Sequence, residues 1–142
     1  LNGRTSYKKE VDKIVEYFVD EKHFTKIGVF YQNDVYGRSG LKAVKEALRE
    51  KNMEIAAEGS YKRNTLSVGH ALYEISQKNP QGIVMVGATK PTAEFIKRAR
   101  MGKKLEGALY AAISFSGSDL LVNELQGRVD NTCWLTLSSF ST

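Results

Sequence analysis

Five segments of strand length are spaced along the chain and separated by polar turns. Their β-branched and aromatic residues are typical of buried strands, and the run GIVMVG at 82–87 is the clearest example. The expected strands are Lys26–Tyr31, Met53–Tyr61, Gly82–Gly87, Leu105–Ile113 and Thr132–Leu137.

Between these segments, apolar residues recur at helical spacing, which predicts a helix before each strand. The apolar faces are Val11, Ile14, Val15, Phe18 and Val19; Leu41, Val44, Ala47 and Leu48; Val68, Leu72 and Ile75; and Ala93, Ile96 and Ala99, with a last short helix at Ser118–Leu125. Thr5 or Ser6 is expected to cap the first helix and Thr65 the third. Thr89 is expected to cap the fourth helix, which Pro91 opens.

The regular alternation of helix and strand predicts the fold class. Neighbouring parallel strands need a crossover connection, which is usually a helix. We therefore expect an α/β three-layer sandwich, with a mostly parallel five-stranded sheet flanked by helices. No repeat or low-complexity linker divides the sequence, so residues 1–142 are expected to form one folding unit.

Composition narrows the classes of function. The 142 residues carry 21 Lys and Arg against 16 Asp and Glu, a net charge of +5 that is spread out, so nucleic-acid binding is not expected. One cysteine excludes an internal disulfide, and with only two histidines beside it a structural zinc site is not expected. The sequence contains no run of 18 apolar residues, so no membrane-spanning helix is predicted. Because the chain starts at Leu1 and ends beyond an apolar strand, we expect a piece of a longer protein.

Motifs of common enzymes are missing from the sequence. No strand is followed by G-x-G-x-x-G or G-x-x-x-x-G-K-[ST], so a glycine-rich phosphate cradle is not expected. There is no G-x-S-x-G motif, and no serine or cysteine has a histidine in a plausible partner loop. A phosphotransfer receiver domain would need clustered carboxylates after the first strand, where Asp34 stands alone. The sequence therefore favours a non-enzymatic role.

Polar loops follow the carboxyl ends of the expected strands, where open α/β sheets bind their ligands. These loops are Gln32–Tyr36, Ser60–Asn64, Gly87–Lys90 and Ser114–Gly117. They are rich in side chains that hydrogen-bond or stack, whereas the opposite edge consists of solvated turns. The asymmetry predicts a surface for a small ligand.

Individual residues of these loops allow two interpretations each. Asp34 precedes a helix, so it suits a capping role as well as a ligand contact. Tyr36 could cover the sheet edge or offer its ring and hydroxyl to a bound molecule. Arg63 and Lys90 are ordinary surface cations, but either would suit a carboxylate.

Four segments, in the same order, resemble a known family. They are YQNDVYGRSGL at 31–41, EGSYKRNT at 58–65, the strand at 83–87 with the helix at 95–100, and ISFSGS at 113–118. The first resembles the D-x-Y-G segment of type I periplasmic binding proteins, in the leucine/isoleucine/valine-binding branch that serves ABC importers. The similarity covers nearly all of this chain but less than half of a complete binding protein.

The resemblance implies the second lobe of a two-lobe protein that closes on its ligand by a hinge. It implies a small-molecule solute, no cofactor, a periplasmic or extracellular location, and two protein partners: the missing first lobe and a membrane permease. The leading interpretation is the solute receptor of an ABC importer. The alternative is the extracellular ligand-sensing domain of a signalling receptor.

The resemblance also implies ligand-binding positions. The aromatic residue of the D-x-Y-G loop maps to Tyr36, and the residue after the third strand maps to Ala88 or Thr89. In amino-acid-binding relatives an acidic side chain after the fourth strand holds the ligand's ammonium group. That position falls at about Ile113 or Ser114, neither of which is acidic, so ordinary α-amino acids are disfavoured. Lys90 and Arg63 would then favour an acid.

Overall fold

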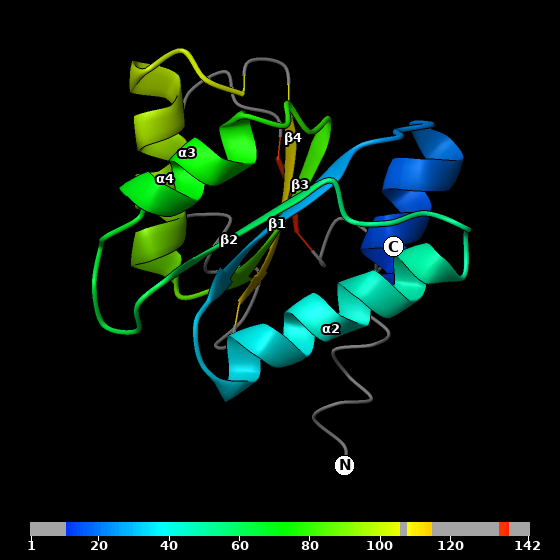
Figure 1. The fold of residues 1–142 in the computed structure, drawn as a ribbon, viewed down its shortest axis with the longest axis horizontal. Coiled ribbons are helices and arrows are strands. Elements are labelled where there is room, and N and C mark those ends of the chain that lie inside the picture. Colours follow the sequence, from blue (N-terminus) through cyan, green and yellow to red (C-terminus); the bar gives the residue numbers. More distant parts are fainter. Residues whose placement is uncertain (1–10, 106–107, 115–133, 137–142) are drawn as a thin grey trace.

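The computed structural model describes residues 11–105, 108–114 and 134–136, and a five-stranded sheet lies at its centre (Figure 1). The strands are β1 (Ile27–Gln32), β2 (Ala57–Tyr61), β3 (Gly82–Gly87), β4 (Leu109–Ser114) and β5 (Trp134–Thr136). Their order is β2-β1-β3-β4-β5, and every neighbouring pair is parallel. The expected α/β sandwich with a parallel sheet is therefore confirmed.

Helices cover both faces of this sheet. One face carries the first helix, at residues 11–16, its π-helical continuation η1 (Tyr17–Glu21), and α2 (Val35–Arg49). The other face carries α3 (Gly69–Ser76) and α4 (Thr89–Met101), as Figure 1 shows. Alternate residues of β1 serve the two sides: Val29 packs with α2, and Phe30 packs with α3 and α4.

Two strands are shorter than the sequence predicts. β2 begins at Ala57 instead of Met53, and β4 begins at Leu109 instead of Leu105. The backbone explains the second difference, because Lys103 and Leu105 have φ of 55° and 58°, in the left-handed region that interrupts a strand. The expected helix at Ser118–Leu125 and the cap at Thr5 or Ser6 lie outside the described residues.

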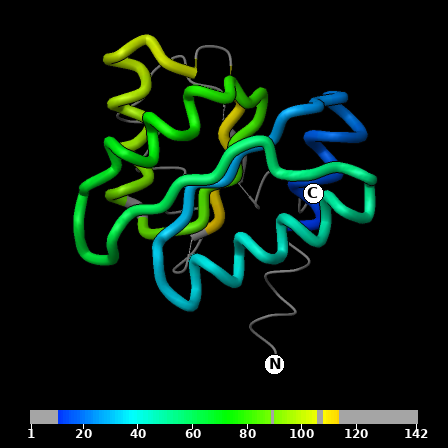
Figure 2. The backbone as a smooth tube through the Cα atoms, viewed as in Figure 1, coloured from blue at the N-terminus to red at the C-terminus, as the bar shows by residue number. Residues whose placement is uncertain are grey.

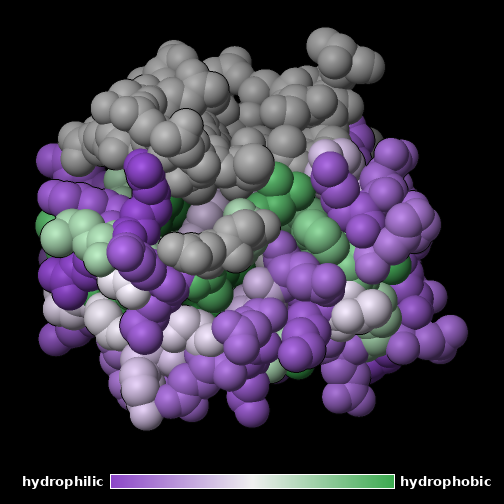
Figure 3. Space-filling model, turned by 90° about the horizontal axis from the view of Figure 1, so that it is seen from above, coloured by the Kyte–Doolittle hydropathy of each residue, from purple (hydrophilic) through white to green (hydrophobic). Residues whose placement is uncertain are grey.

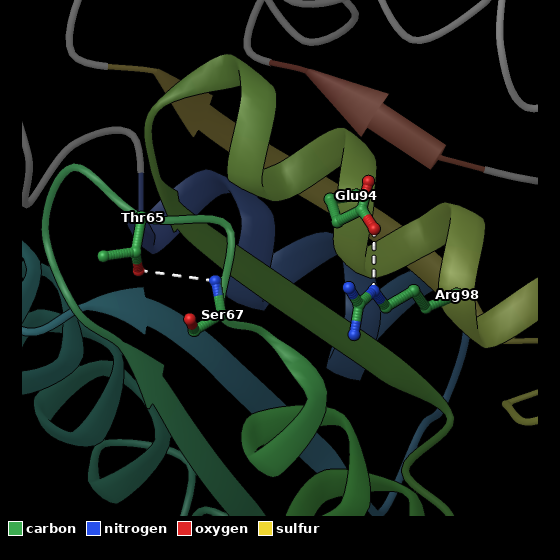
Figure 4. Close-up of polar contacts among 4 residues, drawn as sticks. All are labelled: Thr65, Ser67, Glu94 and Arg98. Atoms are coloured by element: carbon green, nitrogen blue, oxygen red, sulfur yellow. Dashed lines mark hydrogen bonds and ion pairs between the residues drawn. The ribbon is translucent and has the colours of Figure 1, made fainter.

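The expected cap at Thr65 is wrong. Helix α3 begins at Gly69 with Val68 in the N-cap position. The Thr65 hydroxyl instead donates to the carbonyl of Lys62 (2.6 Å) and accepts from the backbone N–H of Ser67 (3.3 Å; Figure 4). Such local bonds are the usual alternative that a threonine offers to a helix cap. They fold the loop before α3 back on itself.

The expected cap at Thr89 also needs correction. Ala88 is the N-cap of α4, and Thr89 is already the first residue of the helix. Pro91 therefore occupies the third helical position, where its missing N–H still costs the helix no internal hydrogen bond.

The chain turns to opposite sides of the sheet at the ends of β1 and β3. From β1 it runs into α2 on one face, and from β3 it runs into α4 on the other (Figure 2). Strands β1 and β3 are neighbours, so the connections that leave their carboxyl ends start side by side and then diverge to opposite faces of the sheet. This is the point at which open α/β sheets form a ligand crevice.

Close packing of β2 against α3 gives a test of the fold. A Cβ atom on Gly59 would lie 2.9 Å from both Cα and Cβ of Ala71, too close for backbone atoms that cannot move aside. Gly59→Ala should lower the free energy of unfolding by about 1–3 kcal/mol, measured by urea denaturation. Ser60→Ala, at the next position of the same strand, is the control. Equal urea midpoints for the two variants would contradict this packing.

Candidate ligand-binding site

A hydrogen-bonded network joins the carboxyl ends of three strands. The Tyr61 hydroxyl, at the end of β2, donates to Oε1 of Gln32 at the end of β1 (2.9 Å). The same hydroxyl accepts from the backbone N–H of Ala88, just after β3 (3.0 Å). One side chain therefore adds a link between all three strand ends, beside the backbone pairing of the sheet.

Asp34 extends the network to the start of α2. Its Oδ1 accepts from the backbone N–H of Gly37 (2.9 Å), and its Oδ2 accepts from Nε2 of Gln32. The sequence leaves two roles open for Asp34, a helix cap and a ligand contact. The structure shows the first, because Asp34 is the N-cap of α2. A side chain at position 37 is impossible here, because a Cβ atom would lie 1.7 Å from the carbonyl oxygen of Gln32.

The Tyr61 side chain is held in place by the core beneath it. Its ring stacks on Phe30 at 5.1 Å between centroids, and Phe30 in turn contacts Phe95 of α4 at 4.3 Å. Burial raises the pKa of the Tyr61 hydroxyl, partly offset by the hydrogen bond from Ala88, while the nearby Asp34 charge raises it further. The hydroxyl is therefore protonated at neutral pH and able to donate to Gln32.

A pocket of about 440 Å³ opens beside this network, at the carboxyl edge of the sheet. It combines polar and apolar walls from the ends of β1, β2 and β3. The lining residues are Gln32, Asn64, Thr65, Leu66, Ala88, Lys90 and Pro91. Asn64 has a left-handed backbone (φ 65°) that turns the chain after β2 toward the pocket.

The six expected binding residues lie at this edge in different positions. Ala88 and Lys90 line the pocket. Tyr36, a residue with 62% of its surface exposed, and the exposed Arg63 lie outside its lining. Thr89 is the first residue of α4, and Ser114 ends β4, paired with Gly87 of β3, so the backbone places both next to the strand end that carries Ala88.

Five lining residues were not among the expected binding residues: Gln32, Asn64, Thr65, Leu66 and Pro91. Gln32 belongs to a polar loop of the sequence analysis, but the structure makes it the buried last residue of β1, with 6% of its surface exposed. A glutamine that ends an otherwise apolar strand is the signal that could have identified it. Asn64 directly follows Arg63, but its role depends on its backbone conformation, and Leu66 carries no sequence signal of binding.

Two other hollows lie away from this edge. One, of about 620 Å³, is lined at the amino edge of the sheet by residues such as Phe24, Pro80 and Lys104. The other, of about 580 Å³, lies between α2 and the approach to β2. Neither hollow touches the carboxyl ends of β1 and β3, where the crevice forms.

Figure 3 shows the molecule from above the view of Figure 1. On this side the described surface is mostly hydrophilic, with a narrower hydrophobic band.

Metal and membrane signals were sought in the described part of the chain. Its His, Cys, Asp and Glu side chains form no group of three that could hold a metal ion. None of its helices is long and apolar enough to cross a bilayer.

Comparisons with known proteins agree with a binding lobe of this architecture. The family model described as periplasmic binding protein matches residues 3–136, and the chain belongs to that family. This match confirms the resemblance to periplasmic binding proteins seen in the sequence. The family is one of solute-binding proteins. A search of curated proteins returned no match.

Solved structures give the same result. A possible leucine/isoleucine/valine-binding protein from Rhodopirellula baltica is 31% identical, with a TM-score of 0.74, over 84% of this chain and 33% of that one. A substrate-binding periplasmic protein from Ralstonia solanacearum is 29% identical, with a TM-score of 0.73, over 86% and 33%. A leucine-binding protein from Thermotoga maritima, 12% identical with a TM-score of 0.74 over 89% and 36%, shares the fold. The chain thus spans about a third of these proteins.

The Tyr61 hydroxyl provides a test of the network. Tyr61→Phe removes the partner of the buried Gln32 oxygen while keeping the ring on Phe30, and should cost about 1–3 kcal/mol of unfolding free energy. Tyr73→Phe, on the exposed side of α3, should change it by less than about 0.5 kcal/mol. Both values come from urea denaturation at neutral pH. A Tyr61→Phe variant as stable as the Tyr73→Phe control would show that the network contributes nothing.

Proposed function

We propose that residues 1–142 form one lobe of a two-lobe receptor and that a small solute binds between the carboxyl edge of this lobe and the other lobe. The observation that carries the proposal is the pocket beside the ends of β1 and β3, whose walls are fixed by the Tyr61 network. Coverage of only a third of the solved relatives supports the presence of a further lobe.

We assign contacts with the solute to the residues expected from the sequence and to two further residues of the pocket. Tyr36, Ala88, Thr89, Lys90, Ser114 and Arg63 come from the sequence and its resemblance, and Gln32 and Asn64 are added because they line the pocket. The last described residues of β4 are Ile113, which is buried, and Ser114. Neither carries a negative charge, so an α-amino group would find no carboxylate partner on the described residues of this strand end.

We also propose that the receptor serves an ABC importer, works in the periplasm and delivers its solute to a membrane permease. Membership of the periplasmic binding protein family supports this assignment. So do the names of structural neighbours that share the fold, such as a branched-chain amino acid ABC transporter periplasmic ligand-binding protein from Burkholderia xenovorans.

A solute screen tests the proposed function. The complete two-lobe protein is heated with amino acids, dicarboxylates, aromatic acids, amides and sugars. A ligand present at a hundred times its dissociation constant adds about 2.7 kcal/mol of stability, enough to raise the melting temperature by several degrees. No shift with any compound of the panel would count against solute binding.

The best compound of the screen then tests the placement of the site. Tyr36→Ala should weaken its binding by roughly 10-fold or more in calorimetry, because an aromatic contact in a closed cleft contributes strongly to affinity. Tyr73→Ala is the matched control, an exposed tyrosine on α3 away from the carboxyl edge. Equal affinities of the two variants would place the solute elsewhere.

A further inference from the structure

We infer that the pocket formed by Gln32, Asn64 and Lys90 is an anion subsite that holds the carboxylate of a solute without an α-amino group. The inference rests on the proposed function and names the chemical class of its ligand. Its basis is the charge of the pocket, the fixed orientation of one amide and the chemistry of the walls.

The lining of the pocket carries one charged residue, the cation Lys90. No Asp or Glu lies in the lining, and no carboxylate in the described residues pairs with the Lys90 ammonium. The Asp34 carboxylate, which contacts the lining residue Gln32 but lies outside the lining, is bonded to the Gln32 amide and to the backbone N–H of Gly37. The acidic residue one turn further along α4, Glu94, is occupied: its Oε2 accepts from Nε of Arg98 at 2.7 Å (Figure 4). A carboxylate entering the pocket would therefore meet an uncompensated cation, which favours it most where water is excluded.

The Gln32 amide is held so that it offers a donor. The Asp34 carboxylate can only accept hydrogen bonds, so the side-chain atom of Gln32 that faces it must be the nitrogen. The oxygen then faces the Tyr61 hydroxyl, which donates to it. An amide nitrogen carries two N–H groups and Asp34 uses one, which leaves the second for a ligand oxygen. Tyr61 is thereby a positioning residue for the subsite.

The walls define the rest of the ligand. Leu66, Ala88 and Pro91 present apolar surface next to the polar groups, and Pro91 brings no N–H. The Ala88 N–H is already bonded to Tyr61. A carboxylate attached to an apolar body matches this combination, whereas an ammonium group beside the carboxylate would find the Lys90 charge instead of an acid.

Matched acids and amides test the subsite in the complete two-lobe protein. The probes are 4-methylpentanoate with 4-methylpentanamide, benzoate with benzamide, and glutarate with glutaramide, titrated by calorimetry near pH 7.5 at low salt. At least one acid should bind about 10-fold or more tightly than its amide, because only the acid gains the Lys90 contact. Raising the salt concentration should reduce this preference.

Two lysine variants locate the effect. Lys90→Met should weaken binding of the preferred acid about 10-fold or more and change binding of its amide by less than about 3-fold. Lys97→Met, an exposed lysine further along α4, should change neither. Tyr61→Phe should lower the acid-to-amide ratio, a readout that general loss of stability does not move.

The outcomes separate the two claims. Equal affinities for acid and amide, or equal weakening of both by Lys90→Met, would overturn the anion subsite while the solute-binding role stands. Binding of neutral or amino solutes from the wider screen, with none of the three acids bound, would overturn it as well. Failure of every compound in the screen would instead overturn the proposed function.

Discussion

Parallel pairing of β1 with both β2 and β3 is the constraint on which the rest of the structure depends. Because β2 lies beyond β1 and β4 lies beyond β3 on the other side, right-handed crossovers place the connections after β1 and β3 on opposite faces of the sheet, so that no single helix covers the edge between them. Backbone pairing already joins the strand ends, with Gln32 opposite Tyr61 and Tyr31 opposite Val86. The Tyr61 hydroxyl adds a side-chain link from β2 to the Gln32 side chain and to the backbone after β3, and it reaches both because its ring is anchored on Phe30 in the core.

The core and the site are therefore parts of one assembly. The apolar cluster under α3 and α4 includes Phe30, Tyr61 and Phe95, and it ends in the polar groups that line the pocket. Gly37 and Gly59 show how tight the surroundings are, since neither position has room for a Cβ atom without movement of the backbone. A site built on such packing is preorganised, because its polar groups need little rearrangement before a ligand arrives.

The sequence predicted the fold well because alternation of two periodicities is a property of the chain itself. It failed at Thr65 and at the start of β4, where local hydrogen bonds and left-handed residues overrode the apolar pattern. The edge that carries the pocket was also predictable, and Ala88 and Lys90, which the sequence offered as binding residues, lie in its lining. The part played by Gln32 was not, because it depends on Tyr61, which is 29 residues away and meets it only in the folded sheet.

Occupation of the Ala88 N–H by Tyr61 has a consequence for how receptors of this type diversify. A backbone N–H is present whatever the side chain, so it would offer the same hydrogen bond to a ligand in every variant. Here the Ala88 N–H is bonded to the Tyr61 hydroxyl and is not available to a ligand. In the proposed site, selectivity just after β3 then depends on the exposed side chain at position 90, in the first turn of α4, which the core does not constrain. If the proposed subsite is right, exchange of that side chain would change the class of solute while the scaffold stays as it is.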